Sequence, residues 1–196
     1  IKNYFFVSQK IFEISSFLSQ GFSDDCRIIV DLGAHAGLVS LQAIKISRRR
    51  DLKAIAVEPI PYHCECLCEN FKGLSLNLIA SGFGRANEKN IKIYIDVQNL
   101  GNSSILPSLL HKGPESYKYI SAPVITLSEV LETIGKKTFV LKTDLQGMDL
   151  HVLSSMNPEI WSQVSRGVIE VNSHSQNSRK ECKTLLEHLD YFFNMS

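Results

Sequence analysis

Three acidic residues stand where apolar runs of the sequence end, and each could hold a polar group of a ligand. The first, Asp31, opens the turn Asp-Leu-Gly-Ala-His-Ala-Gly at residues 31–37. Glycines let a backbone bend tightly and pass close to a ligand, and the helix expected next offers unpaired N–H groups at its start. The Asp31 carboxylate could accept hydrogen bonds from an ammonium group. The pattern therefore predicts a ligand site at this turn.

The other two acids are Glu58 and Asp144. Glu58 ends the apolar run 53–58. It follows the glycine turn by about 20 residues, the distance at which one carboxylate can accept both hydroxyls of a ribose. Asp144 follows the apolar run 138–143. In a doubly wound sheet this later strand lies beside the first, so its end faces the same crevice. We therefore expect Asp31, Glu58 and Asp144 to converge on one cleft.

Each acid alone has a simpler explanation. Asp31 and Asp144 could cap adjacent turns, and Glu58 could be solvated, so it is the ordered combination that favours a ligand site. The fingerprint of nicotinamide-binding turns is incomplete, because His35 and Leu38 stand where its second and third glycines would be. This departure disfavours an oxidoreductase with a dinucleotide cofactor and leaves it as an alternative.

The elements that must position these acids alternate short apolar runs with amphipathic stretches. That order is typical of an α/β, Rossmann-like fold with a mostly parallel, twisted sheet and helices on both faces. We expect strands at residues 27–32, 53–58, 74–80, 90–96, 124–126, 138–143 and 165–171. We expect helices at residues 4–18, 38–47, 62–71, 127–134, 148–156, 158–161 and 177–189, and a last strand from residue 191.

We interpret residues 1–196 as a single domain with two additions. Residues 1–24 form an N-terminal helical flank, and residues 81–122 form an insertion over the site. Within the insertion, residues 97–122 are rich in Gly, Asn, Ser, Pro and Lys. A connection of that length without regular structure is usually functional, so the segment is predicted to act as a lid.

Composition excludes several classes of partner. The net charge of +1 provides no strong field to recruit nucleic acid. No apolar run approaches the roughly 20 residues of a membrane span, so no stable membrane insertion is expected. No secretory signal is visible at the start of the sequence. The oligomeric state is not indicated.

The five cysteines do not suggest a disulfide framework or a metal site. Their number is odd, and Cys64, Cys66 and Cys68 alternate along an expected helix, which turns Cys66 away from the face of the other two. A zinc site usually needs a second pair of ligands elsewhere. We therefore expect free thiols, no metal, and a reducing, cytoplasmic location.

Taken together, the chain resembles the FkbM-type methyltransferases, which use S-adenosylmethionine (SAM). The resemblance covers residues 27–190, and its most distinctive element is Lys-Thr-Asp-Leu-Gln-Gly at residues 142–147. The matching residues are Val30–Gly37 with Ser40, Glu58–Pro59, Gly101–Ser104, Val124–Leu131, Leu141–Gly147 and Ile169–Val171. The resemblance implies a class I methyltransferase fold and O-methylation of a hydroxyl on a small molecule or glycan. That fold ends in an antiparallel hairpin, whose strands are expected here to be truncated or reduced.

The resemblance also assigns roles to residues. Asp31, Gly33 and Gly37 would line the methionine part of SAM, Glu58 would hold the ribose, and Asp144 would face the transferred methyl. Ser103 and Ser104 could help to close the site. The complete set expected to bind SAM is Asp31, Gly33, Ala34, His35, Gly37, Ser40, Glu58, Pro59, Ser81 and Asp144.

A hydroxyl acceptor benefits from a base that removes its proton. Asp144, Glu170 and His174 are the catalytic candidates, because the first two lie at strand ends that face the predicted cleft and His174 follows the strand 165–171 by a few residues. His35 is expected to shape the glycine turn, and His151 to lie on a helix surface. Two alternatives remain open: a SAM-binding protein without catalytic activity, and the oxidoreductase considered above.

Overall fold

The central element is a five-stranded sheet with strand order β3-β2-β1-β7-β8, in which every neighbouring pair is parallel. The computed structural model describes residues 2–83, 88–95, 103, 117–170 and 183. The strands are β1 Cys26–Leu32, β2 Lys53–Val57, β3 Ser75–Ile79, β7 Thr138–Thr143 and β8 Val164–Ile169. The chain reverses its direction of travel across the sheet between β1 and β7. Ligands of open parallel sheets bind outside the strand ends at such a switch point.

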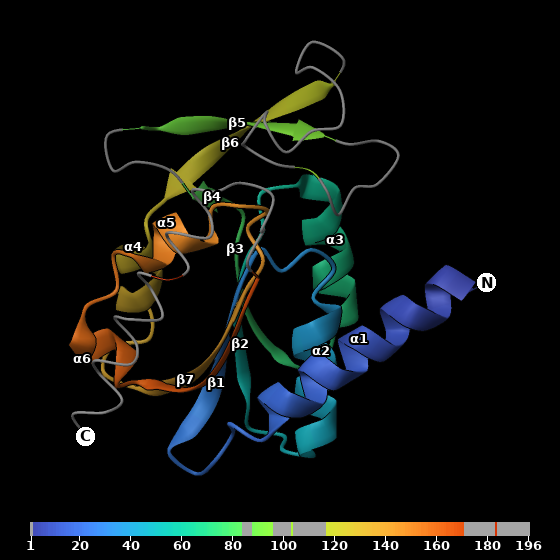
Figure 1. Ribbon diagram of the computed structural model, residues 1–196, viewed down its shortest axis with the longest axis vertical. Coiled ribbons are helices and arrows are strands. Elements are labelled where there is room, and N and C mark those ends of the chain that lie inside the picture. The colour runs from blue at the N-terminus through green and yellow to red at the C-terminus, as the bar shows by residue number, and fades with distance from the viewer. Residues whose placement is uncertain (1, 84–87, 96–102, 104–116, 171–182, 184–196) are drawn as a thin grey trace.

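Helices cover both faces of this sheet (Figure 1). Side chains alternate along each strand, so Val30 and Ile55 pack on one face and Ile29 and Ala54 on the other. The first face is covered by α4 Leu127–Glu132, α5 Asp149–Leu153 and α6 Pro158–Trp161, and the second by α1 Lys2–Ser19, α2 Leu38–Ser47 and α3 Pro61–Asn70. This arrangement confirms the predicted Rossmann-like α/β class.

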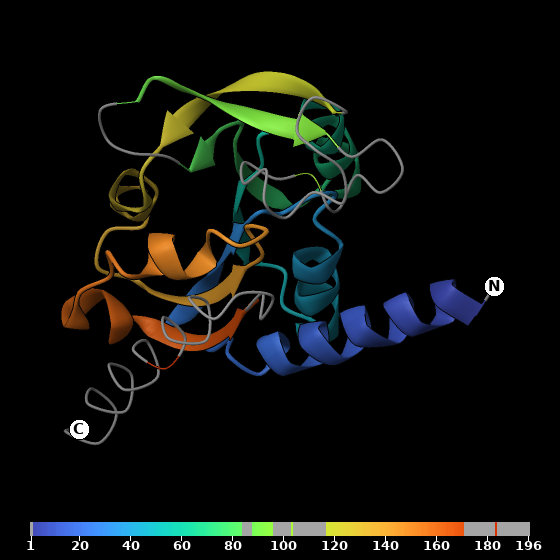
Figure 2. The same ribbon diagram turned by 45° about the horizontal axis from the view of Figure 1, so that its top comes forward.

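A second, three-stranded sheet with order β4-β6-β5 lies beyond the carboxyl ends of the main sheet (Figures 1 and 2). Its strands are β4 Gly82–Phe83, β5 Asn90–Ile95 and β6 Lys118–Ile125. β6 pairs antiparallel with β5 and parallel with β4. The Gly82 backbone is close to β5: a Cβ there would lie 2.5 Å from Ile91 Cδ1. The insertion therefore contributes a folded layer above the main sheet.

The second sheet corrects one sequence-based boundary. Residues 118–122 were expected to lie in an irregular segment, but they form most of β6. Ser121 and Pro123 conceal the strand pattern, while pairing with β5 supplies the stabilisation that local propensity does not. The rings of Tyr94 and Tyr119 meet across the pair, 6.4 Å apart. Residues 84–87, 96–102 and 104–116 lie outside the described residues, and the role of a lid stays a prediction.

A helix and a strand near the end of the described chain are shorter than expected. The helix predicted at 148–156 is limited to α5, and the strand predicted at 165–171 is described as far as Ile169. The helix predicted at 177–189 and the strand predicted from residue 191 fall almost wholly outside the described residues.

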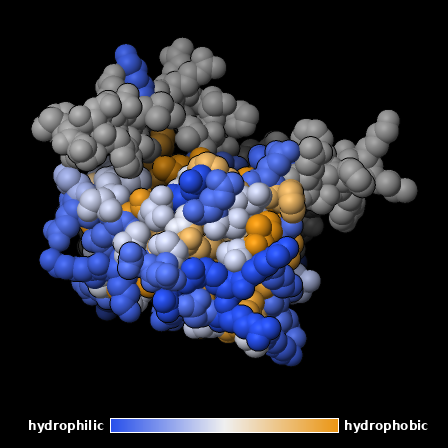
Figure 3. All heavy atoms as spheres, turned by 90° about the horizontal axis from the view of Figure 1, so that it is seen from below, coloured by the Kyte–Doolittle hydropathy of each residue, from blue (hydrophilic) through white to orange (hydrophobic). Residues whose placement is uncertain are grey.

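The N-terminal helix α1 packs against α2. Leu18 is fully buried, and the Ser15 hydroxyl lies 3.0 Å from the Val39 carbonyl oxygen. In the part of the chain that the structure describes, no helix combines the length and apolar character needed to cross a bilayer. The face opposite the second sheet is largely hydrophilic (Figure 3). Exposed ion pairs, such as that between Arg27 and Asp51 at 2.7 Å, are found at this amino-terminal end of the strands.

Candidate functional site

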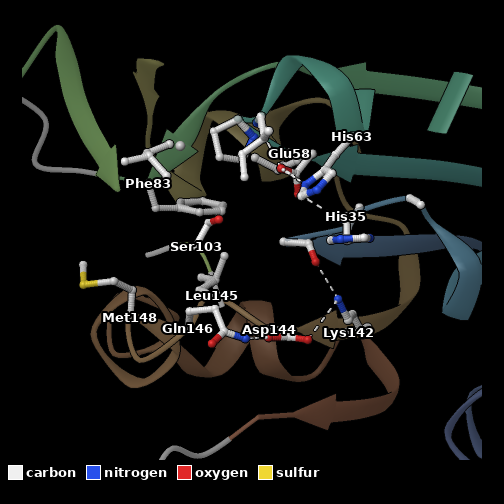
Figure 4. Close-up of a pocket in the computed structure, with 18 of the residues that line it drawn as sticks. His35, Glu58, His63, Phe83, Ser103, Lys142, Asp144, Leu145, Gln146 and Met148 are labelled. Carbon is white, nitrogen blue, oxygen red and sulfur yellow. Dashed lines mark hydrogen bonds and ion pairs between the residues drawn. The ribbon is translucent and has the colours of Figure 1, made fainter. Parts of the chain in front are cut away.

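A cavity of about 440 Å³ lies at the carboxyl ends of β1, β2 and β7 (Figure 4). The second sheet contributes Gly82, Phe83 and Ile93 to its wall, and the turn after β7 contributes Leu145 and Met148. Cavities of roughly 300–1,000 Å³ are typical of small-molecule sites. Seven predicted cofactor-binding residues line the cavity, namely Gly33, Ala34, His35, Glu58, Pro59, Ser81 and Asp144.

The glycine turn is fixed between two strands. The N–H of Gly33 donates to Val57 O at 2.9 Å, and the N–H of Asp144 donates to Leu32 O at 2.9 Å. Gly33 has φ +76°, and a Cβ there would lie 2.0 Å from the Asp144 carbonyl oxygen. Only a glycine allows the ends of β1 and β7 to approach this closely. The two chemistry-bearing segments thus meet at a contact that any side chain would prevent.

Gly37 lies at the start of α2, outside the residues that line the cavity. Its φ of +71° lets it begin α2, and a Cβ there would lie 2.8 Å from the Phe71 ring. It therefore allows α2 to pack near α3 and does not line the cavity. Its predicted contact with the methionine part of SAM stays a prediction.

Asp31 and Ser40 also lie behind the wall. Asp31 is 1% exposed and does not line the cavity. Its Oδ2 accepts a hydrogen bond from the Ser40 hydroxyl, and its Oδ1 lies 3.0 Å from the Lys142 ammonium nitrogen. Lys142 and Ser40 thus surround this carboxylate away from the cavity, and the expected contact between Asp31 and a ligand ammonium stays a prediction.

Lys142 is the main residue that sequence reasoning overlooked as part of the site. Its Nζ donates to Gly33 O at 2.6 Å and lies 3.9 Å from Asp144 Oδ2, in addition to its pairing with Asp31. Burial alone would lower the pKa of Lys142, but the carboxylates of Asp31 and Asp144 outweigh burial and raise it. The available signal was a lysine within the apolar strand Phe139-Val140-Leu141-Lys142, since a buried cation needs anionic partners.

Glu58 is buried at the end of β2 and is held by three donors. Its Oε2 accepts the His35 N–H at 2.8 Å. Its Oε1 accepts the Ile60 N–H at 3.0 Å and lies 3.1 Å from His63 Nδ1. An ionised carboxylate offers about four acceptor positions. The side chain is therefore fixed before any ligand arrives, and its remaining capacity is mainly on Oε2.

His63 is a second residue that the sequence pattern did not reveal. It is 2% exposed, borders the cavity, and its Nε2 is buried without a partner among the described residues. Its ring packs against that of His35, with centroids 3.8 Å apart. Burial is the main cause that lowers the pKa of His35, and the neighbouring His63 lowers it further. The two imidazoles thus form one edge of the cavity beside Glu58.

The catalytic candidates occupy different depths. The Asp144 side chain is 39% exposed and lines the cavity, whereas Glu170 is not among the lining residues. Gln146 connects them: its Nε2 donates to Asp144 Oδ1 at 2.8 Å and to Glu170 Oε2 at 3.4 Å. His174 lies outside the described residues, and His151 is exposed on α5 as expected. Asp144 is therefore the candidate that can reach a ligand directly.

The turn after β7 is closed by Asp149, whose carboxylate accepts the Leu145 N–H at 3.0 and 3.1 Å. Figure 4 shows that Leu145 and Met148 lie across the cavity from His35 and Lys142. The cavity therefore has a charged side formed by the main sheet and an apolar side formed by the second sheet and this turn. Among the described residues, no group of three metal-ligating side chains is close enough to hold a metal ion.

Replacing Lys142 with Met should leave the buried Asp31 carboxylate without its cation. We expect the free energy of unfolding to fall by about 3–5 kcal/mol, measured by urea denaturation. The matched control is Lys136→Met, because Lys136 pairs with Glu159 on the surface, where an ion pair contributes about 0–1 kcal/mol. The double variant Lys142→Met, Asp31→Asn should recover part of the loss. Equal effects of the two lysine substitutions would contradict this assignment.

Glu170 should make stability depend on pH. The pKa of Glu170 is raised to about 8, mainly by burial and also by the neighbouring Asp144. The folded protein therefore retains a proton that the unfolded chain releases at lower pH, and this contribution to stability is lost as the pH rises through about 8. Between pH 5 and pH 9, the free energy of unfolding of Glu170→Gln should rise by roughly 1–3 kcal/mol relative to that of the wild type, measured in urea titrations. Parallel pH profiles for the two proteins would argue against a raised pKa.

Comparison with known proteins places the site in a family. A family model described as the methyltransferase FkbM domain matches residues 31–195. No curated protein matches the chain. A solved structure of precorrin-6y C5,15-methyltransferase from Geobacter metallireducens GS-15 is similar, with 12% identity and a TM-score of 0.40. The similarity covers 77% of this chain and 55% of that one, so the chain spans about half the length of that protein. Because the family model includes the glycine turn, Glu58 and the segment 142–147, the chain belongs to the FkbM methyltransferase domain family.

Proposed function

We propose that this protein transfers a methyl group from SAM to a hydroxyl group of a small molecule or glycan. The observation that carries the proposal is the convergence of Gly33, Glu58 and Asp144 on one cavity at the switch point of the sheet. Each of these residues directly follows the last residue of a different strand, β1, β2 or β7. Membership of the FkbM methyltransferase domain family supports the same activity.

The residues of the cavity suit the chemical groups of SAM. Glu58 Oε2 retains acceptor capacity for a ribose hydroxyl, and the buried Nε2 of His63 nearby has no partner among the described residues. The side chains of Ile60 and Phe83 offer apolar surface to a purine. Asp144 provides a partly exposed carboxylate for positive charge. The backbone of Gly33 borders the same cavity, beside the turn after β7 that its missing side chain allows to approach.

SAM would supply a methyl group on a positively charged sulfur, and transfer forms a C–O bond as the C–S bond breaks. The protein can accelerate this reaction by holding the acceptor oxygen in line with the methyl carbon and by excluding water. Phe83, Leu145 and Met148 form the apolar wall that would exclude water. The hydroxyl proton must also leave, and of the described candidates Asp144 reaches the cavity while Glu170 lies behind it.

The first experiment is a screen of cofactors by thermal shift. S-adenosylhomocysteine (SAH) should raise the melting temperature of the protein, and NAD and FAD should not. Stabilisation by NAD or FAD alone would favour the oxidoreductase alternative. Binding of SAH without turnover of any hydroxyl compound would favour a SAM-binding protein that is not catalytic.

Glu58→Gln should weaken SAH binding. The substitution keeps the shape of the side chain but removes the charge that strengthens its hydrogen bonds, so we expect affinity to fall roughly tenfold to a hundredfold in isothermal titration calorimetry. Glu132→Gln is the matched control, because Glu132 is exposed on α4 and does not line the cavity. Unchanged affinity in a folded Glu58→Gln protein would remove the ribose contact from the proposal.

A further inference from the structure

The two acceptors that the glycine turn would offer to an ammonium group are already occupied. Lys142 Nζ donates to Gly33 O at 2.6 Å and lies 3.0 Å from Asp31 Oδ1. Asp31 is 1% exposed and is separated from the cavity. A second cation brought to this position would meet the Lys142 ammonium instead of a free anion. The positively charged amino group of the methyl donor must therefore be recognised elsewhere.

Among the described residues that line the cavity, two are acidic, Glu58 and Asp144. Figure 4 shows them apart, with Glu58 beside His63 and Asp144 beside Lys142. Glu58 already accepts from His35 and Ile60 and contacts His63. Its surroundings suit a neutral sugar hydroxyl rather than a further cation.

Asp144 has the properties that an ammonium site needs. Its side chain is 39% exposed and borders the cavity. The backbone N–H of Asp144 is fixed on Leu32 O at 2.9 Å, and Gln146 Nε2 donates to Oδ1 at 2.8 Å, so the carboxylate is oriented before a ligand binds. Lys142 lies 3.9 Å from Oδ2. A ligand cation on the cavity side of Asp144 would place this carboxylate between two positive charges, that of the ligand and that of Lys142.

We propose that Asp144 binds the α-ammonium group of the methyl donor, in place of Asp31. This inference rests on the proposed use of SAM. It also changes the expected role of Asp144 in proton transfer. A bound cation stabilises the ionised carboxylate and makes it a weaker base.

Calorimetry with three ligands can test the proposal without an acceptor substrate. SAH carries the α-amino group, a deaminated SAH analogue lacks only that group, and 5′-methylthioadenosine lacks the whole amino-acid part. Wild-type protein should bind SAH roughly tenfold to a hundredfold more tightly than the deaminated analogue, because one charge-assisted hydrogen bond is lost. This comparison needs no variant.

The variant Asp144→Asn should lose most of that preference. Its affinity for SAH should fall roughly tenfold or more, and its affinity for 5′-methylthioadenosine should stay within about twofold of wild type. Glu132→Gln, an exposed change on α4, should alter neither affinity. A separation of the two ligands cannot arise from general misfolding, which would weaken both.

The outcomes separate this inference from the proposed function. If wild-type protein binds neither SAH nor 5′-methylthioadenosine, the proposed use of SAM is wrong, and the inference fails with it. If wild type binds both and Asp144→Asn retains full preference for SAH over the deaminated analogue, only the ammonium assignment fails. Equal weakening of SAH and 5′-methylthioadenosine in Asp144→Asn would also overturn it, because the residue would then act on the whole site.

Discussion

One buried ammonium group joins the parts of this molecule that bear its chemistry. Lys142 extends from β7 to the carbonyl of Gly33 and to the carboxylate of Asp31 on the neighbouring strand β1. A charge this deeply buried is tolerated only when its partners are fixed around it. Those partners belong to the glycine turn and to β1, so the position of the turn depends on an ion pair as well as on backbone hydrogen bonds. The geometry of the cavity rests on this arrangement.

The cavity itself requires two layers of different origin. The parallel sheet supplies the charged side, because the ends of its strands bring Glu58 and Asp144 to one edge. The second sheet supplies Phe83 and Ile93 and covers that edge. Charged groups exert stronger forces where water is excluded. The second sheet therefore contributes to recognition through the environment that it creates as well as through its contacts.

Much of this arrangement could be predicted from the sequence. Apolar runs with polar ends located β1, β2 and β7, and the order of Asp31, Glu58 and Asp144 indicated a common edge of the sheet. Burial could not be predicted, because whether Asp31 faces the cavity depends on which side of β1 its side chain takes and on the reach of Lys142. His63 and Gln146 were missed because their partners are set by the folding of loops and helices. β6 was found only in part, since its stability comes from pairing with β5 and not from local pattern.

The joins between the two sheets limit how the cover over the cavity can move. β3 ends at Ile79, and β4 begins at Gly82 after a short turn in which the N–H of Ser81 donates to Ile79 O at 2.9 Å. At the other join, β6 ends at Ile125, and Thr126 caps α4 in a reciprocal pair with Glu129. Helix α4 is in turn anchored by Leu127 and Val130 in the main core. Because both connections are short and hydrogen-bonded, the second sheet is held to the main fold at two points. The second sheet would thus give the cavity a preformed wall, whose shape limits which molecules can fit against it.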